Sequence, residues 1–303
     1  MRVIEDRIVP FLAGLGAEGD IDDLVTRAAE QARVRFRAKA WALGALKAGA
    51  ESSGFDSRLH VWGRPFLITE EDAEAVADWV LRFSAATPDT VDGLVVEQLR
   101  RLDPALAERV RPDMSGTLPE GENLRRMVSW KVELLRHAAL ALRAGRTRVE
   151  DPHSDDVHDA AGLLTGNAQF VLLEFVAALL PGWMDRGHTW PTRLGPETGA
   201  GLPAGFGGNG ALLGRLPELL PDLDWTDDES IMGNYSVGGM VPPDRVPAAR
   251  AWLTEHRDRL VGDDGYLETS QRKCREAFAL ADRIGGGFVE ATEIYSGFEG
   301  KIN

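Results

Sequence analysis

ALALRAGRTRVE at residues 139–150 returns near the C-terminal end as ALADRIGGGFVE at residues 279–290, with seven of the twelve positions identical. Each stretch begins with alanines and leucines that fit a helix, and a glycine, Gly145 or Gly285, interrupts it. Glycine often ends a helix because it adopts the left-handed backbone conformation at little steric cost. The valine and glutamate that close each stretch then predict a short strand. We therefore expect the same helix–turn–strand unit at both places.

A second pair of matching segments precedes these two stretches. Residues 67–69 lead into a helical run that ends near Trp79, and residues 240–242 lead into one that ends near Trp252. Both halves thus have the order strand, helix, helix, strand, which predicts an internal duplication with both tryptophans mostly buried. One such unit cannot bury both faces of its strands, so we expect the copies to share a sheet. The alternative is chance similarity between helices rich in alanine, leucine, arginine and glycine.

The fold class predicted on this basis is α+β: mostly helical, with a mixed β-sheet and an internal duplication of a β-α-α-β unit. The four regions are an N-terminal helical segment (1–58), a first copy with a helical insertion (59–150), a helical and Gly/Pro-rich middle region (151–230) and a second copy (231–303).

Apolar spacing predicts the individual elements. The three- and four-residue intervals of an amphipathic helix occur at residues 21–48, 123–144 and 267–284, and an apolar helix is expected at 161–180. Residues 59–69 alternate as a strand does, and residues 91–121 are expected to hold a further helix and a connection.

Composition and charge exclude some classes of protein. With 44% apolar and 27% charged residues, the chain has the composition of a folded, soluble protein. Its 34 basic and 48 acidic residues give a net charge of −14. This balance argues against nucleic-acid binding and against adhesion to anionic membranes, because both need clustered lysine and arginine.

The sequence also predicts a compartment. The single cysteine, Cys274, excludes an internal disulfide. Acidic residues stand near the N-terminal end, where a secretory signal would be basic and then apolar. The longest apolar run, residues 170–180, is interrupted by Glu174 and is too short to span a bilayer. Only five of the 34 basic residues are lysine, a bias typical of GC-rich bacterial genomes, so we expect a cytoplasmic bacterial protein.

Two of the six histidines stand in a short acidic segment, DPHSDDVHD at residues 151–159. If this segment is helical, Asp155, His158 and Asp159 share a face, a spacing that can supply metal ligands. Together with His153 and the more distant His188, these residues support one hypothesis, a metal-assisted hydrolase. The competing interpretation is a solvated loop whose acids favour the start of the following helix.

Loops in the middle region combine tryptophans with polar side chains. Tryptophan supplies apolar contact area at binding sites, and carboxylates favour a cationic group. We expect a contact site for a partner protein or a small cationic ligand at Trp183, Asp185, His188, Trp190, Trp225, Asp227 and Asp228.

No known catalytic motif stands out in the sequence. GFGGNG at residues 205–210 has the glycine spacing of a dinucleotide-binding loop, but prolines and glycines rather than a strand precede it, so we expect an irregular loop. The leading hypothesis is therefore a non-catalytic binding protein of the accessory or toxin-neutralising type. The sequence identifies no cofactor and leaves the oligomeric state open.

Overall fold

The computed structural model describes residues 3–51, 73–102, 104–113, 121–179, 210–225, 230–232, 235–261 and 265–292. Helices form most of this part of the chain, and a few short strands complete it. The helical elements are η1 (Ile4–Ile8), α1 (Val9–Leu12), α2 (Asp22–Glu51), α3 (Ala73–Ser84), α4 (Val91–Leu102), α5 (Pro104–Arg109), α6 (Gly121–Arg143), α7 (Ala160–Leu179), α9 (Gly210–Leu213), α10 (Leu216–Leu219), η3 (Pro243–Arg245), α11 (Val246–Glu255), α12 (Arg257–Val261) and α13 (Gly265–Arg283). The strands are β1 (Arg148–Glu150), β2 (Val157–Asp159), β3 (Ser230–Met232), β4 (Tyr235–Val241) and β5 (Phe288–Thr292).

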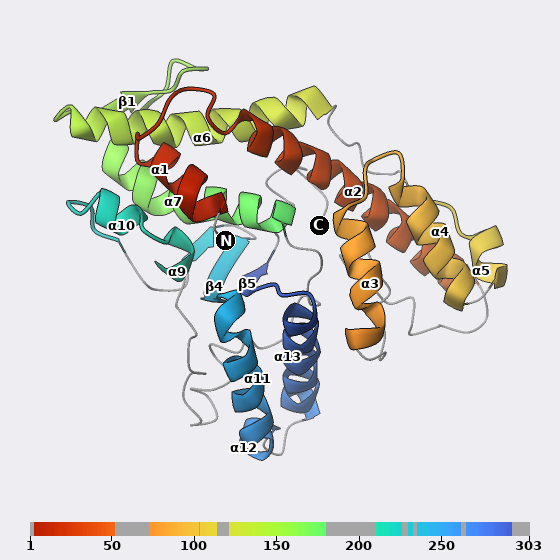
Figure 1. The fold of residues 1–303 in the computed structure, drawn as a ribbon. Coiled ribbons are helices and arrows are strands. Elements are labelled where there is room, and N and C mark those ends of the chain that lie inside the picture. The colour runs from red at the N-terminus through yellow and green to blue at the C-terminus, as the bar shows by residue number, and fades with distance from the viewer. Residues whose placement is uncertain are drawn as a thin grey trace.

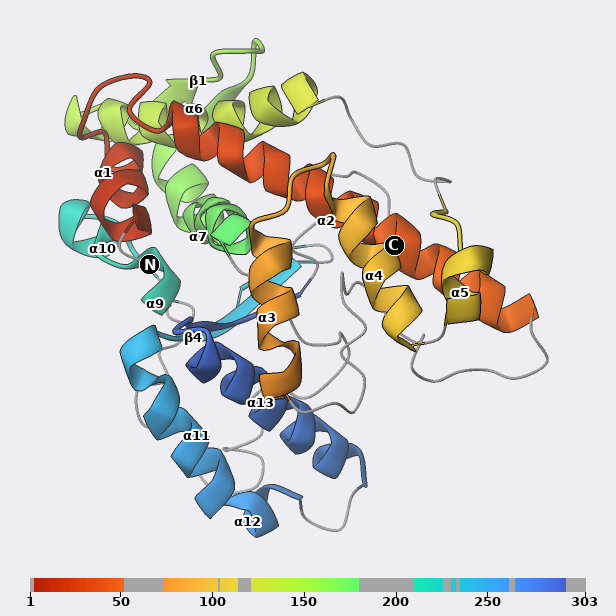
Figure 2. The ribbon, with the colours of Figure 1, turned by 45° about the vertical axis from the view of Figure 1, so that its right-hand side comes forward.

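Helix α2 connects two groups of helices. Its 30 residues give it a length of about 45 Å, enough to contact α6 and α7 near one end and α4 farther along (Figures 1 and 2). The predicted helix at residues 21–48 is thereby confirmed. Buried apolar side chains continue along most of its length, so α2 has no single partner: Leu24, Val25, Ala28, Ala29, Ala32, Val34, Ala38, Trp41 and Ala45.

The main core lies between α1, the first half of α2, α6 and α7. On α6 the buried residues Leu124, Val128, Val132, Leu135 and Ala139 recur every three or four positions, which places them on one face of the helix. The helix predicted at residues 123–144 follows from this same pattern. Residues of α7, α9 and α10 and Met240 of β4 complete the core, so it draws on segments far apart in the chain.

Smaller core clusters surround the other helices. Phe83 of α3 and Leu280 of α13 belong to a cluster that also includes residues of α2 and α4. A second cluster joins Trp41 of α2 to Leu99 of α4. A third joins α11, α12 and α13 through Leu253, Leu260 and Phe278, beside β4 and β5 in both ribbon views (Figures 1 and 2).

The described strands form two antiparallel sheets rather than the predicted mixed sheet. Strands β1 and β2 pair alone, with Val149 opposite His158, and β3, β4 and β5 pair in that order. Short links join β1 to β2 and β3 to β4, and a short link allows only antiparallel pairing. The expectation of one mixed sheet is therefore corrected for the described strands; the strand expected at residues 59–69 lies outside them.

The two repeated stretches end their helices in the same way. Gly145 and Gly285 have φ angles of 72° and 64°. At the first, the Gly145 and Arg146 N–H groups donate to the Leu142 and Ala141 carbonyls. At the second, the Gly285 and Gly286 N–H groups donate to the carbonyls of Asp282 and Ala281. This is the left-handed glycine ending that the sequence indicated, and a strand follows each.

The surroundings of the two units differ. Helix α11 packs on α13, whereas α3 packs on α13 and α4, and α6 packs on α2 and α7. Trp79 and Trp252 are each mostly but not fully buried, as expected, yet their neighbours differ: Arg82 lies over the ring of Trp79 and His256 stacks on that of Trp252. The duplication stays a prediction, as do the four regions drawn from it.

The remaining predicted helices, strand and loop are compared here with the structure. The helices expected at residues 161–180 and 267–284 are confirmed as α7 and α13, and the insertion holds α4 and α5. The strand expected at residues 59–69 and the loop at 205–210 lie outside the described residues, apart from Gly210 at the start of α9. Within the described residues, no helix combines the length and the hydrophobicity needed to cross a membrane.

Candidate functional site

The strongest candidate site lies where α11 and α13 pack together. On α11, Val246, Ala249 and Leu253 are buried against Cys274 and Phe278 of α13. Their spacing of three and four residues places them on one face of α11, with Trp252 packed at its edge, whereas Pro247, Ala248 and Ala251 are exposed. Pro243 begins the short helix η3 that precedes α11, and Pro247 lies in the first turn of α11; both are positions where proline is tolerated.

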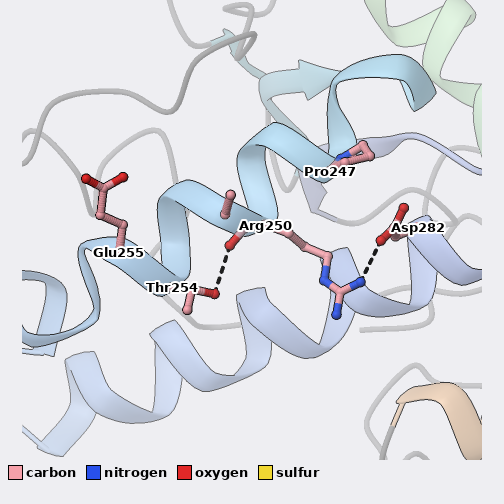
Figure 3. A pocket seen from close by; sticks show the side chains of 6 residues that line it. Pro247, Arg250, Thr254, Glu255 and Asp282 are labelled. Atoms are coloured by element: carbon pink, nitrogen blue, oxygen red, sulfur yellow. Dashed lines mark hydrogen bonds and ion pairs between the residues drawn. The ribbon is translucent and has the colours of Figure 1, made fainter.

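The outward face of α11 and the end of α13 border an open groove of about 570 Å³ (Figure 3). Proline and alanine give the groove short apolar walls, and the remaining side chains are polar or charged. The lining residues are Pro247, Arg250, Ala251, Thr254, Glu255 and Asp282. Pro247, Ala251 and Glu255 are four residues apart, so they form one row about 12 Å long on α11.

An ion pair crosses the groove from α11 to α13. The Arg250 Nη1 atom lies 2.5 Å from the Asp282 Oδ2 atom, and the two side chains are 41% and 34% exposed. The Thr254 hydroxyl donates to the Arg250 carbonyl oxygen at 3.0 Å, so its hydrogen bond is satisfied within α11 (Figure 3). Contacts within and between the two helices thus hold Arg250, Thr254 and Asp282 in place.

The groove has an excess of negative charge. Its lining includes the carboxylates of Glu255 and Asp282 and one guanidinium, that of Arg250. Arg250 is engaged by Asp282, whereas no salt bridge joins Glu255 to another residue in the described part of the chain. An arrangement of this kind favours a positively charged group in the groove.

The residues predicted as metal ligands lie on the β1–β2 hairpin. His158 and Asp159 are successive residues of strand β2, not of a helix, so their side chains point to opposite faces of the hairpin. The Asp159 Oδ2 atom accepts a hydrogen bond from the Gly162 N–H at the start of α7. His153 is exposed and lies 3.5 Å from Glu133 of α6. Among the described residues, no three His, Cys, Asp or Glu side chains form a group suited to a metal ion.

Asp151, which the sequence analysis did not single out, organises this hairpin. Its side chain is buried, and its carboxylate accepts hydrogen bonds from the Trp130 indole N–H at 2.9 Å and the His153 backbone N–H at 2.8 Å. Desolvation raises the pKa of Asp151, but these hydrogen bonds outweigh it, and the pKa lies below its usual value. The carboxylate therefore stays charged and fastens the turn to α6.

Only one residue of the predicted contact site is within the described chain. Trp225 is half-buried against the main core, and its indole N–H donates to the Leu220 carbonyl oxygen at 3.0 Å. Its polar atom therefore serves the local fold. The other residues predicted for this site lie outside the described residues: Trp183, Asp185, His188, Trp190, Asp227 and Asp228.

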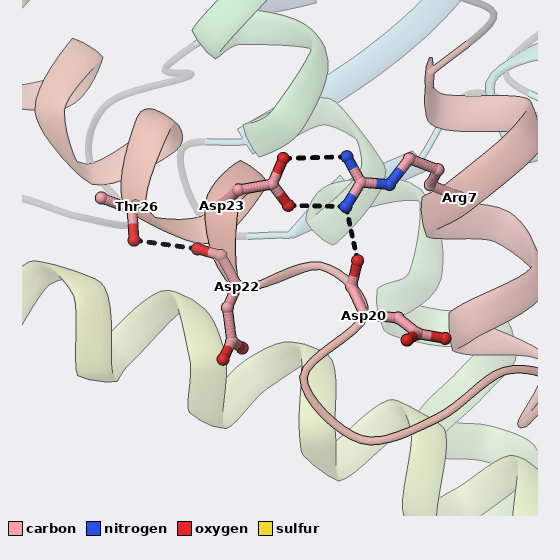
Figure 4. Close-up of polar contacts among 5 residues, drawn as sticks. All are labelled: Arg7, Asp20, Asp22, Asp23 and Thr26. Atoms are coloured by element: carbon pink, nitrogen blue, oxygen red, sulfur yellow. Dashed lines mark hydrogen bonds and ion pairs between the residues drawn. The ribbon is translucent and has the colours of Figure 1, made fainter.

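A second polar cluster, at the start of α2, serves the fold. The Arg7 Nη1 and Nη2 atoms bind the two carboxylate oxygens of Asp23 at 2.9 and 2.6 Å, and Nη2 also donates to the Asp20 carbonyl oxygen (Figure 4). The hydrogen bond from Arg7 lowers the pKa of Asp23 despite some desolvation. These contacts join η1 to the first turn of α2.

Sequence reasoning missed the α11–α13 groove for a clear reason. Arg250 and Asp282 are separated by 32 residues, so no local motif connects them. The sequence indicated only that one face of this helix is exposed, because Pro247, Ala251 and Thr254 are small or polar whereas the other face is apolar.

Comparisons with known proteins returned nothing: no family model, curated protein or solved structure matches this chain. The interpretation of its function therefore depends on the geometry and the charges of the groove.

Proposed function

We propose that this chain is a non-catalytic binding protein of the bacterial cytoplasm and that it binds a partner protein at the groove between α11 and α13. The observation that carries the proposal is the groove itself, about 570 Å³ in volume and bordered by two helices that a buried cluster holds together. Binding sites built on packed helices keep their geometry better than sites on loops do.

The shape of the groove favours a protein over a small molecule. Small ligands bind in concave pockets that cover about 70–90% of their surface, whereas this groove lies open along the outward face of α11. A partner protein adds contacts beyond the groove, and a stable interface needs about 800 Å² on each side. Pro247, Ala251, Thr254 and Glu255 are exposed and available for such contact.

Site-specific cross-linking tests this proposal. A photoreactive amino acid replaces Ala251 in the groove or, as a control, the exposed Ala144 beyond the end of α6. We expect irradiation of living cells to give one discrete adduct from position 251 and none of that size from position 144. Mass spectrometry of the adduct then identifies the partner.

The purified partner supplies the decisive measurement. Ala251→Trp fills the groove with a large side chain, and we expect it to raise the Kd for the partner at least tenfold. The circular dichroism spectrum and the Tm should stay unchanged. Ala144→Trp should leave the Kd unchanged. Equal adducts from both positions, or an unchanged Kd for Ala251→Trp, would refute the proposal.

A further inference from the structure

We infer that the partner presents a lysine or arginine side chain to the α11–α13 groove, with its aliphatic stem along Pro247 and Ala251 and its charged head at Glu255. This inference rests on the proposed function and names the chemistry of the contact. It follows from the charge of the lining, from the order of the residues along α11 and from the accessibility of the Glu255 carboxylate.

The distribution of charge decides between a basic and an acidic side chain. Asp282 binds Arg250 at 2.5 Å, and an acidic side chain of the partner would have to displace it. The same acidic side chain would also face the carboxylate of Glu255. A basic side chain meets Glu255 directly and leaves the Arg250–Asp282 pair intact. Like charges brought together in an interface are strongly unfavourable, so the acidic alternative is disfavoured.

The row on α11 matches the shape of a long basic side chain. Pro247 and Ala251 provide two short apolar side chains on successive turns, and Glu255 follows one turn later. Lysine and arginine commonly lay their methylene groups on apolar surface while the charged head remains in water. The row of about 12 Å is long enough for the stem and the head together.

The Glu255 carboxylate is accessible at the end of α11. Glu255 is the last residue of this helix and is exposed. His256, the next residue, places its Nδ1 atom 3.0 Å from the Trp252 carbonyl oxygen and stacks on the Trp252 ring. The imidazole therefore lies back against α11 and does not cover the carboxylate.

Two synthetic peptides test this chemistry even while the partner is unidentified. Both are helical, alanine-based and of equal length, one carrying lysines and the other glutamates at the same positions. We expect the lysine peptide to shift the backbone amide signals of Ala251, Thr254 and Glu255 saturably in the NMR spectrum of the whole chain. The glutamate peptide should leave these signals unchanged.

A matched pair of charge variants separates the groove from general attraction to an acidic protein. Glu255→Gln should raise the Kd for the lysine peptide about fivefold, as expected for the loss of one charged contact. Glu18→Gln removes the same charge from the exposed loop before α2 and should change the Kd less than about twofold. Equal effects of the two variants, or shifts confined to other helices, would overturn the inference.

The two proposals fail in different ways. If cross-linking at Ala251 yields a partner whose affinity survives Glu255→Gln, the groove binds protein but not through a basic side chain. If Ala251→Trp does not change the Kd for that partner, the groove is not its binding site and both proposals are wrong.

Discussion

Gly44 lies at a close backbone contact between α2 and the chain that follows α5. A Cβ atom built there would lie 1.7 Å from the Arg111 carbonyl oxygen, because the chain after α5 crosses α2 directly at this glycine. The Asp113 N–H donates to the Ala40 carbonyl oxygen at 2.7 Å in the same crossing. The place therefore accepts only a residue that has no side chain.

Gly44→Ala should destabilise the protein by about 1–3 kcal/mol, since the added methyl group overpacks the crossing and the backbone must move. Gly166→Ala is the matched control, because Gly166 is also inside a helix but has open space around it. That variant should stabilise the protein by about 0.5–1 kcal/mol. Urea unfolding measures both changes in the free energy of unfolding. A Gly44→Ala variant as stable as the wild type would show that α2 and the chain after α5 do not cross closely at Gly44.

At the scale of elements, a polar joint fixes α4 on α2. The Arg37 Nε and Nη2 atoms bind the Asp92 carboxylate at 2.7 and 2.8 Å, and the Trp41 indole N–H donates to the same group at 2.8 Å. The hydrogen bond from Arg37, with help from Trp41, lowers the pKa of Asp92 against the opposing effect of desolvation. The joint therefore depends on a charged carboxylate.

Asp92→Asn should lower the free energy of unfolding by about 1 kcal/mol at pH 7. The effect is this small because the Asp92 side chain is 40% exposed and water screens the charge. Because the pKa of Asp92 is lower in the folded state, the stabilisation is complete above the unfolded-state pKa and is lost as pH falls through the folded-state pKa. The difference between wild type and variant should thus close in acid. Unfolding curves from pH 7 to pH 2 measure it; the exposed Asp89→Asn should show no such difference.

Local signals explain what could be predicted at this scale. Apolar spacing located α2, α6, α7 and α13, and Gly145 marked the left-handed end of α6. Strand β2 was missed because VHD at residues 157–159 has no strand pattern of its own; its pairing with β1 makes it a strand. Sheet partners and the groove depend on contacts between distant residues, which local patterns do not record.

At the scale of the molecule, the described chain has one large core and several smaller ones. The cluster around Phe278 joins α11, α12 and α13, and the ring of Phe278 stacks on that of Phe288 with centroids 4.4 Å apart. Leu172 of α7 belongs to the main core instead. The helices that carry the groove therefore have a core of their own, next to the main one.

Phe278→Ala should lower the free energy of unfolding by about 3–5 kcal/mol, because it leaves a cavity at a fully buried position. Hydrogen exchange should accelerate in α11 and α13 more than in α6 and α7. Leu172→Ala, at a cost of about 2–5 kcal/mol, should show the reverse distribution. Identical exchange patterns in the two variants would mean that the cores unfold as one unit.

The composition of the main core has a consequence for how the protein is made. Residues Ile4 to Ala32 share this core with Leu124 to Ala141 of α6, which leave the ribosome about 90 residues later, and with Leu212 to Leu220, which follow about 180 residues later. At about 5–20 residues per second, the first helices wait roughly 5–20 s for α6 and roughly 10–40 s for the last part of the core. Until α6 emerges their apolar faces lack these partners, and we expect chaperones at the ribosomal exit to bind the nascent chain during this interval.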